Sequence, residues 1–535
     1  MSFELETASA TAQNLRRVAI DPVSRVEGHG KVTILLDDQH RVHQVRLHIV
    51  EFRGFERFIQ GRPYWEVPVM VQRLCGICPV SHHLAASKAL DLVVGVDKLT
   101  TTAEKLRRLM HYGQILQSHA LNFFHLSSPD LLFGFDADVD KRNIVGVAEA
   151  HPDIAKKGIL LRKFGQEVIR VTAGKRVHGT GSVPGGVNRS LAREERDLLL
   201  KDIYQMVAWS RDAVNIIKQL HQQNPALYDH FGTFRSNFMG LVAPDGSLDL
   251  YHGALRARDA DGKILFDQVD YQTYNQLITE EVKPWSYMKF PFLNLLGPEE
   301  GWYKVGPLAR VQNCDSIPTP FAEHERKELV AYAGHQPLHA TLAYHWARMI
   351  EMLFAAETIK DLLHDDDLEG HDLMAPAGER RREGVGVIEA PRGTLIHHYQ
   401  VADNDLVTMA NLIVSTTNNN QAMNTAVREV AKQYLDGREI TEGLLNHIEV
   451  AIRAFDPCLS CATHALGQMP LEVSLVDAEG TVIDRVSRDQ SGLQHLSCRR
   501  RFWFSPGATR VGATMPSAPV LPKRSRPWRC PVWSA

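Results

Sequence analysis

Two widely separated pairs of cysteines constrain the fold of this chain more than any other feature of its sequence. The first pair, Cys75 and Cys78, lies in RLCGIC, and the second pair, Cys458 and Cys461, lies in DPCLSC, 380 positions further along. A two-residue spacer lets both sulfurs of a pair bind one metal ion. If the four thiolates share one site, the fold must bring an early and a late segment of the chain together.

The surroundings of the first pair favour thiolates. Pro79 suits the first position of a helix, so Cys78 is expected at a helix N-terminus, where free N–H groups stabilise negative charge. Gly76 permits a tight turn between the sulfurs. By spacing alone the four cysteines suit Zn²⁺, an iron–sulfur cluster or nickel, and a closed four-cysteine zinc site is the structural alternative. The long gap counts against zinc, because zinc ribbons hold their pairs close together in sequence.

Composition excludes several classes of protein. The chain has 535 residues, 44% of them hydrophobic, which predicts one large domain or two to three medium ones. A net charge of −3 argues against nucleic-acid binding, and no run approaches 18 apolar residues, so no membrane-spanning helix is predicted. Without an apolar segment after a basic start we predict no secretory signal and a cytoplasmic location, where cysteines favour metal or redox roles.

Hydrophobic periodicity predicts a predominantly α-helical α+β fold. Strands are expected at residues 31–36 and 42–50, joined as a hairpin, and a last hairpin at residues 471–486. The glycine- and proline-rich stretches 178–186 and 384–393 are expected to be loops. Helices are expected at residues 80–94, 103–126, 198–220, 342–362, 421–434 and 441–455.

The C-terminal part differs in composition. From Gln490 onward there is no Asp or Glu, but there are seven Arg, one Lys and six Pro. Residues 1–489 therefore carry a net charge of −11, and the rest carries +8. Such a basic tail suits an anionic surface, but its composition is also that of an unfolded extension, and we predict the latter for residues 489–535.

Five motifs in order resemble the large subunit of nickel–iron hydrogenases. They are RVEGHG at residues 25–30, RGFE at 53–56, RLCGIC at 73–78, EAPRG at 389–393 and DPCLSC at 456–461. The resemblance spans residues 18–488 and implies a large-subunit fold, with a central helical bundle and small peripheral β-sheets. Residues 52–56, 81–83, 116–119, 285–291 and 458–469 look most like the NAD-reducing, bidirectional type.

The resemblance implies two metal sites. All four cysteines would bind nickel, and Cys78 and Cys461 would also bridge to an iron that carries one carbon monoxide and two cyanides. Cys75 and Cys458 would be terminal nickel ligands. Glu56 and His464 match the ligands of a buried Mg²⁺ ion; a histidine ligand is unusual for magnesium, so this site rests on the resemblance alone.

Two charged residues match catalytic positions of the family. Glu27 would accept protons beside the terminal thiolate of Cys458, which is itself the next candidate base; from spacing alone Glu27 would be an ordinary surface carboxylate. Arg392, which follows Pro391 in a fixed loop, would hold its guanidinium over the open metal position, whereas its simpler reading is a salt bridge.

Three further residues match the surroundings of the metals. Asp456 would pair with Arg392, although an aspartate there can also be a helix N-cap. The Thr416 hydroxyl would bond a cyanide, and His82 would donate to the sulfur of Cys78. Without the resemblance, Thr416 would be a strand-end threonine and His82 a core histidine. Many respiratory members carry an aspartate where this chain has Ser118, so Ser118 is left out of the site.

The implied activity is H₂ + NAD⁺ ⇌ H⁺ + NADH. A related respiratory-complex subunit lacks the four cysteines, so this chain should be catalytic. It has no phosphate-binding loop, no dinucleotide fingerprint and no further cysteines for iron–sulfur clusters. NAD, FMN and the clusters are therefore expected on partners: diaphorase subunits and a small iron–sulfur subunit. The alternatives are a hydrogenase that serves a deazaflavin, NADP or a quinone, and a zinc-stabilised, non-catalytic subunit of a redox complex.

The last expectation is that the chain is a precursor. Cys458 and Cys461 must lie deep inside, and a strand-forming continuation cannot leave a packed core without unsatisfied backbone groups. By resemblance, a maturation endopeptidase cuts after His464 once nickel is inserted. Residues 1–464 would then be the mature subunit, with residues 465–488 as a propeptide; the alternative is a final hairpin that stays attached.

Overall fold

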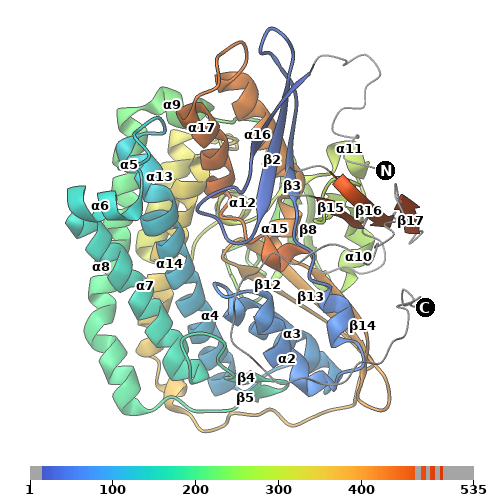
Figure 1. Ribbon diagram of the computed structural model, residues 1–535. Coiled ribbons are helices and arrows are strands. Elements are labelled where there is room, and N and C mark those ends of the chain that lie inside the picture. Colours follow the sequence, from blue (N-terminus) through green and yellow to red (C-terminus); the bar gives the residue numbers. More distant parts are fainter. Residues whose placement is uncertain (1–14, 464–470, 477–481, 489–493, 498–535) are drawn as a thin grey trace, which may run out of the picture. The chain divides into compact units, whose positions relative to one another are not determined.

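The computed structural model describes residues 15–463, 471–476, 482–488 and 494–497 of the chain. It divides into two units, the first comprising Met1–Glu472 with Ser487–His495 and the second comprising Val473–Val486 with Leu496–Ala535. The bulk of the described structure belongs to the first unit (Figure 1). Among the described residues, no helix is both long enough and apolar enough to cross a membrane.

Helices are the main secondary structure of the first unit. The long ones are α3 (Pro79–Val93), α4 (Thr101–Leu121), α7 (Pro152–Ala173), α8 (Arg193–Gln223), α13 (Pro320–Tyr332), α14 (Ala343–Leu363), α16 (Asn420–Tyr434) and α17 (Glu442–Ala454). The short ones are α1 (Phe55–Ile59), α2 (Val67–Met70), α5 (Ser128–Phe133), α6 (Ile144–Ala150), α9 (Pro225–His230), α10 (Tyr274–Leu277), α11 (Gly297–Glu300), α12 (Pro307–Asn313) and α15 (Ser415–Asn418). Single turns of 3₁₀-helix are η2 (Tyr64–Glu66), η3 (Val71–Leu74), η5 (Tyr271–Thr273), η6 (Asp366–Glu369) and η7 (Ser460–Ala462), and η4 (Asn122–Ser127) is a π-helix.

The strands form several small sheets. A three-stranded sheet joins β1 (Arg16–Ile20), β2 (Gly30–Leu36) and β3 (Val42–Ile49), and another joins β12 (Glu383–Ala390), β13 (Gly393–Val401) and β14 (Val407–Ile413). A four-stranded sheet has the order β11 (Tyr303–Lys304), β6 (Asn237–Val242), β7 (Ala254–Arg258) and β8 (Ile264–Val269). Two-stranded sheets pair β4 (Ser182–Val183) with β5 (Gly186–Val187) and β9 (Ile278–Glu281) with β10 (Phe290–Leu293), and β15 (Leu471–Val476), β16 (Val482–Arg488) and β17 (Gln494–Ser497) form a last sheet.

A helical bundle forms the core of the first unit. Helix α4 packs against α7 and α14, and α14 also packs against α8 (Figure 1). Nearly all side chains of α14 are buried, as expected for a helix surrounded by others. Helix α3 lies instead against β12 and β13. This architecture confirms the predicted helical α+β fold with small sheets.

Most predicted elements are present, with three corrections. The loop expected at residues 178–186 contains the short strand β4 and the first residue of β5. The helix expected to reach residue 126 ends as α-helix at Leu121 and continues as the π-helix η4. The loop expected at residues 384–393 is wrong, because these residues form β12, a two-residue turn and the start of β13. Its glycines serve close packing: a Cβ added at Gly384 would lie 2.0 Å from the carbonyl oxygen of Ala89, and one at Gly386 2.3 Å from that of Ala85.

The contact between α3 and β12 yields a stability prediction. Gly386→Ala forces α3 away from the sheet, and we expect it to destabilise the fold by about 1–3 kcal/mol, as overpacking does. The melting temperature of the purified variant measures this effect and should be lower than that of the unsubstituted protein. Thr408→Ala, an exposed position of the same sheet, is the matched control and should melt as the unsubstituted protein does. Equal melting temperatures for all three proteins would contradict the tight contact.

Candidate metal centre

Two different local structures present the cysteine pairs. Cys75 follows η3, and Cys78 is the N-cap residue of α3, with Pro79 in its first turn, as the sequence predicted. The second pair follows α17, and Cys461 lies within η7. All four side chains are buried.

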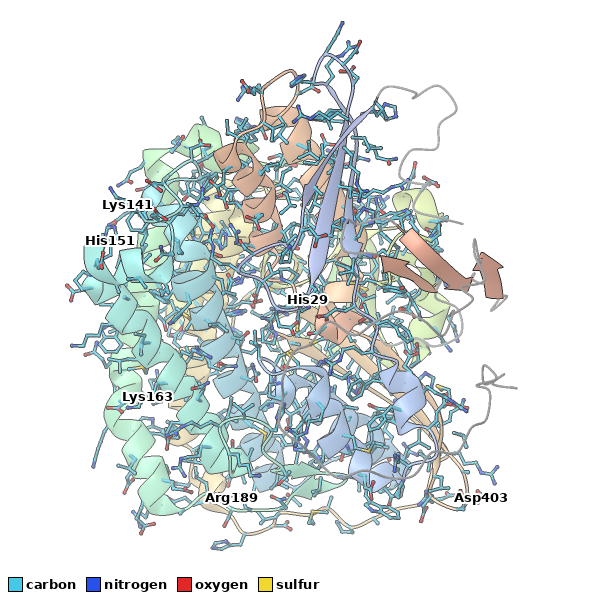
Figure 2. The ribbon with its side chains drawn as sticks, viewed as in Figure 1. His29, Lys141, His151, Lys163, Arg189 and Asp403 are labelled. Carbon is cyan, nitrogen blue, oxygen red and sulfur yellow. The ribbon has the colours of Figure 1, made fainter. Side chains whose placement is uncertain are left out.

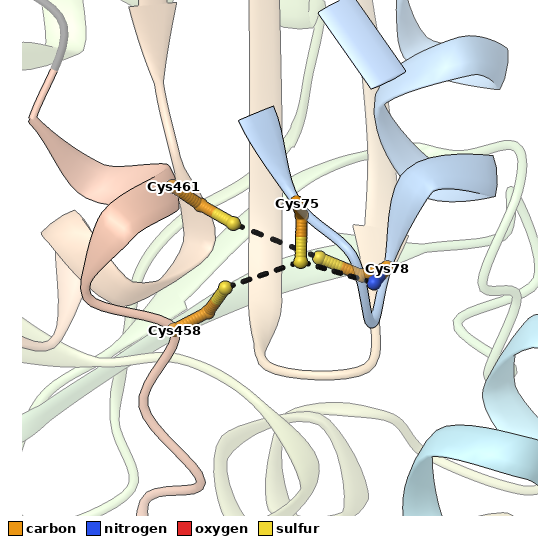
Figure 3. Close-up of side chains that lie close together, drawn as sticks. All are labelled: Cys75, Cys78, Cys458 and Cys461. Carbon is orange, nitrogen blue, oxygen red and sulfur yellow. Dashed lines mark hydrogen bonds between the residues drawn. The ribbon is translucent and has the colours of Figure 1, made fainter. Parts of the chain in front are cut away.

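The fold brings the four sulfurs into one cluster (Figure 3). Their Sγ atoms all lie within 4.8 Å of one another. Cys75 Sγ is 3.3 Å from Cys458 Sγ, and Cys78 Sγ is 4.0 Å from Cys461 Sγ. The backbone N–H of Cys78 also donates to Cys75 Sγ at 3.1 Å, so the turn between the first two cysteines supports negative charge on that sulfur.

Burial disfavours free, ionised thiolates in this cluster and suits the four cysteines to bind a metal. Burial raises the pKa of Cys461 and Cys458 well above the ordinary thiol value, whereas hydrogen bonds from the neighbouring sulfurs outweigh burial at Cys75 and lower its pKa. Four thiolates can therefore ionise together only beside a cation. A soft transition metal suits such a donor set.

Arg53 ties the two cysteine segments to each other. Its guanidinium donates to the carbonyl oxygens of Leu74 at 2.7 Å and Arg73 at 2.9 Å, just before the first pair. Its backbone N–H donates to the carbonyl oxygen of Thr463 at 3.1 Å, just after the second pair. One residue of the RGFE motif thus bonds both segments that carry the cysteines.

Arg392 lies in the turn between β12 and β13 and pairs with Asp456. Its Nε donates to the carbonyl oxygen of Asp456 at 2.6 Å, and Nη2 lies 3.1 Å from the carboxylate. Burial lowers the pKa of Arg392, but Asp456 and the sulfurs raise it well above its ordinary value, so it is a permanent cation. The buried Nη1 has no hydrogen-bond partner among the described residues. Asp456 follows the end of α17 and is no helix N-cap.

Six residues singled out from the sequence line one small cavity. They are Cys78, His82, Pro391, Arg392, Thr416 and Cys458. Thr416 lies in α15 rather than at a strand end, and its hydroxyl oxygen accepts the N–H of Cys458 at 2.9 Å. Burial lowers the pKa of His82 to about 4, so this imidazole is neutral near pH 7. The hydrogen bond from His82 to Cys78 stays a prediction.

Glu27 lies beside the sulfur of Cys458. Its Oε2 is 2.9 Å from Cys458 Sγ, and its carbonyl oxygen accepts the N–H of Leu459 at 2.9 Å. The side chain is half-buried, while His29, two residues later, is exposed just before β2 begins (Figure 2). The segment around Glu27 therefore leads from the sulfur cluster to solvent.

The expected magnesium site is only partly within the described residues. Glu56 Oε1 accepts the N–H of Leu412 at 2.9 Å, and burial raises the pKa of Glu56 to about 7, although Lys289 lowers it. His464 lies outside the described residues. Ser118 is fully buried, and no described residue bonds its hydroxyl.

The negative charge of a second group of possible metal ligands is already balanced by a lysine. Within the described ranges, the only other such group is His324, Glu325 and Glu328 on α13. Lys218 Nζ lies 2.9 Å from Glu325 and also pairs with Glu328. The lysine supplies the positive charge there, so the cysteine cluster is the candidate metal centre.

Three contacts of the site were missed by the sequence analysis. His82 Nδ1 lies 3.1 Å from His397 Nε2, and the hydroxyl of Ser460 donates to Glu27. Arg310 bonds the carbonyl oxygens of the turn that carries Arg392. Ser460 lies between the two cysteines of DPCLSC, so its contact with Glu27 beside the cluster had a signal in the sequence. Nothing in the sequence connects Arg310 or His397 with the cysteines.

Comparison with protein families matches two models. A model described as HoxL-like matches residues 17–52, and a model described as nickel-dependent hydrogenase matches residues 53–143 and 251–464. The matched ranges include both cysteine pairs and the Arg392 turn.

Similar proteins cover most of the chain. The NAD-reducing hydrogenase HoxS subunit beta of Cupriavidus necator is 50% identical, over 88% of this chain and 100% of its own length. One subunit of the F420-non-reducing hydrogenase vhc of Methanococcus voltae is 42% identical, over 87% of this chain and 98% of its own length. A crystal structure of an NAD⁺-reducing NiFe-hydrogenase in the H₂-reduced state is 60% identical, with a TM-score of 0.82 over 84% of this chain and 99% of that one.

The sulfur cluster yields a metal-binding prediction. Cys458→Ser removes one of four soft ligands, so the purified variant should contain less than about a tenth of the metal of the unsubstituted protein by elemental analysis. Cys314→Ser removes a buried thiol that lies outside the cluster and should leave the metal content unchanged. Full metal content in the Cys458 variant would contradict the assignment.

Proposed function

This chain belongs to the nickel-dependent hydrogenase family, and on that premise we propose that it is the catalytic subunit of an NAD-reducing nickel–iron hydrogenase. The reaction is H₂ + NAD⁺ ⇌ H⁺ + NADH. The names of the relative that is 50% identical and of the solved structure that is 60% identical support NAD as the electron acceptor. The observation that carries the proposal is the buried cluster of four sulfurs.

The cluster fits a nickel–iron centre. Four thiolates suit nickel, and two of them can bridge to a second metal. Cys75 and Cys458 would hold nickel alone, and Cys78 and Cys461 would hold both nickel and iron. When bound, such a centre supplies the redox-active Lewis acid at which H₂ is split heterolytically.

Groups of this chain around the cavity suit small, polar iron ligands. The free Nη1 of Arg392 and the hydroxyl of Thr416 would donate to the two cyanides, and His82 would donate to the sulfur of Cys78. Asp456 orients the arginine. A fixed cation beside the cluster also stabilises charge that develops as H₂ is polarised.

Glu27 moves the proton. Its Oε2 is within hydrogen-bond distance of Cys458 Sγ, and Ser460 holds the same carboxylate through its N–H at 3.2 Å. A proton on the sulfur can therefore pass to Oε2 and from there toward solvent, and the reverse path serves H₂ formation.

Electrons must leave through other subunits. The described residues contain no second cysteine cluster, and the sequence has no dinucleotide fingerprint. Gly76, between the first two cysteines, is exposed, so a partner can approach the centre there. We propose that a small iron–sulfur subunit binds there, that diaphorase subunits hold FMN and NAD, and that the complex is cytoplasmic.

A magnesium ion remains part of the proposal. Glu56 is partly buried, burial raises its pKa, and a divalent cation would favour its ionised form. His464 would be the second ligand. Glu56 does not line the metal-centre cavity, so we assign the ion a structural role.

Metal analysis and infrared spectroscopy of the purified complex test the proposal. We expect nickel and iron in equal amounts, infrared bands from metal-bound carbon monoxide and cyanide, and H₂-dependent reduction of NAD⁺. Zinc alone, without these bands, would instead indicate a structural subunit. Bands without NAD⁺ reduction would keep the hydrogenase and reject NAD as its acceptor.

Glu27 yields a kinetic prediction. Glu27→Gln keeps the size and the polar contacts of the side chain but removes the base, so exchange between D₂ and H₂O should slow by at least about 100-fold. Metal content and infrared bands should be retained. Glu66→Gln, at an exposed carboxylate, is the control and should exchange normally. Normal exchange in the Glu27 variant would point to the Cys458 thiolate as the base.

The C-terminus yields a second prediction. We propose residues 1–464 as the mature subunit, residues 465–488 as a propeptide that a maturation endopeptidase removes, and residues 489–535 as a basic extension. Ala462 and Thr463 are buried next to the cluster, which supports a chain end there. Mass spectrometry of active enzyme should find a C-terminus at His464, whereas full-length protein with full activity would contradict processing.

A further inference from the structure

The turn that carries Arg392 has an unusual place for a hairpin tip. Pro391 and Arg392 alone connect β12 to β13, with Ala390 opposite Gly393. Hairpin turns usually face water, but this one is buried beside the sulfur cluster. Its peptide carbonyl groups therefore need partners inside the protein.

Arg310, in the middle of α12, supplies those partners. It is fully buried, and its Nη1 donates to the carbonyl oxygen of Ala390 at 2.6 Å. Its Nη2 donates to the carbonyl oxygen of Pro391 at 3.3 Å. These are the two carbonyl groups that immediately precede Arg392.

The rest of the Arg310 guanidinium is held by two carboxylates. Nε and Nη2 each donate to Glu351 at 2.6 Å, and Nη1 donates to Glu389 at 2.9 Å. All five N–H groups of the side chain thus have acceptors in a single fixed orientation. A lysine cannot reproduce this pattern, because its three donors sit on one nitrogen.

Both carboxylates are anchored in turn. Glu351 on α14 accepts from His119 Nε2 on α4 at 3.0 Å. Glu389 accepts from the N–H of Leu241 on β6 at 2.9 Å and from the Thr394 hydroxyl on β13 at 2.8 Å. Burial raises the pKa of Glu351, but Arg310 and His119 bring it down to about 2, so it stays ionised.

We infer that Arg310 is a positioning residue for the reaction, acting through the turn that carries Arg392. By fixing the carbonyl groups of residues 390 and 391 to the helical bundle, it sets where the Arg392 guanidinium lies relative to the cysteine sulfurs. This role deepens and rests on the proposed function, in which Arg392 acts directly at the metal centre. A displacement of about 1 Å in such a group can cost on the order of 100-fold in rate.

Arg310→Lys tests the inference, with Arg107→Lys as the matched control. Arg107 is an equally buried arginine that bonds Asp91 and the carbonyl oxygens of Val183 and Gly186. Val183 and Gly186 do not line the metal-centre cavity. Both variants lose hydrogen bonds in the core, but only the first releases the Arg392 turn.

In the Arg310 variant we expect unchanged nickel and iron content, a kcat lower by about 10- to 100-fold, an unchanged KM for H₂ and shifted cyanide infrared bands. The control should keep the bands and kcat of the unsubstituted enzyme. Unshifted bands with normal kcat, or equal changes in both variants, would overturn the positioning role.

Two further measurements keep the test decisive. If Arg310→Lys does not fold, Glu389→Gln replaces it and should shift the same bands by a smaller amount; no shift would reject the inference. Crystal structures of metal-free protein separate this inference from the proposed function. In these structures Arg392 should be displaced from Asp456 in the Arg310 variant only. This result does not depend on whether the unsubstituted protein shows cyanide bands. An Arg392 that stays beside Asp456 in the variant would reject the inference.

Discussion

The meeting of four buried sulfurs is the constraint on which the rest of the structure depends. Two segments 380 positions apart must stay within 4.8 Å of each other at their sulfur atoms. The bonds of Arg53 to both segments hold them there, and a β-bridge fixes Cys458 against Glu27. Burial opposes ionisation of several thiols together, so a bound cation and the folded chain stabilise each other.

The buried arginines around the cluster are paired with carboxylates. Arg392 faces Asp456, and Arg310 faces two glutamates. An unpaired charge in such an interior would cost several kcal/mol, and a half-satisfied network would leave the side chains mobile. Pairing therefore serves two purposes: it makes burial of the charges tolerable, and it holds the one reactive guanidinium in a defined place beside the metal ligands.

Local pattern predicted most of the elements. The helix expected at residues 342–362 and the strands expected at residues 31–36 and 42–50 depend only on neighbours in sequence, and the structure has α14, β2 and β3 at these places. The stretch 384–393 was misread because glycine signals a loop locally, whereas Gly384 and Gly386 are needed where α3 lies against the strand. The π-helical turn η4 had no local signal.

The sequence by itself determined the ligand types, their spacing, the helix start at Cys78 and, through its motifs, the candidate residues Glu27, Arg392 and Thr416. Only the tertiary structure decided which sulfurs face each other, that Ser460 bonds Glu27, and that Arg310 supports the Arg392 turn. The physical reason is that spacing along the sequence constrains only atoms within one turn of the chain. Contacts between residues separated by tens to hundreds of positions depend on how the helices and sheets pack, and no local pattern records that packing.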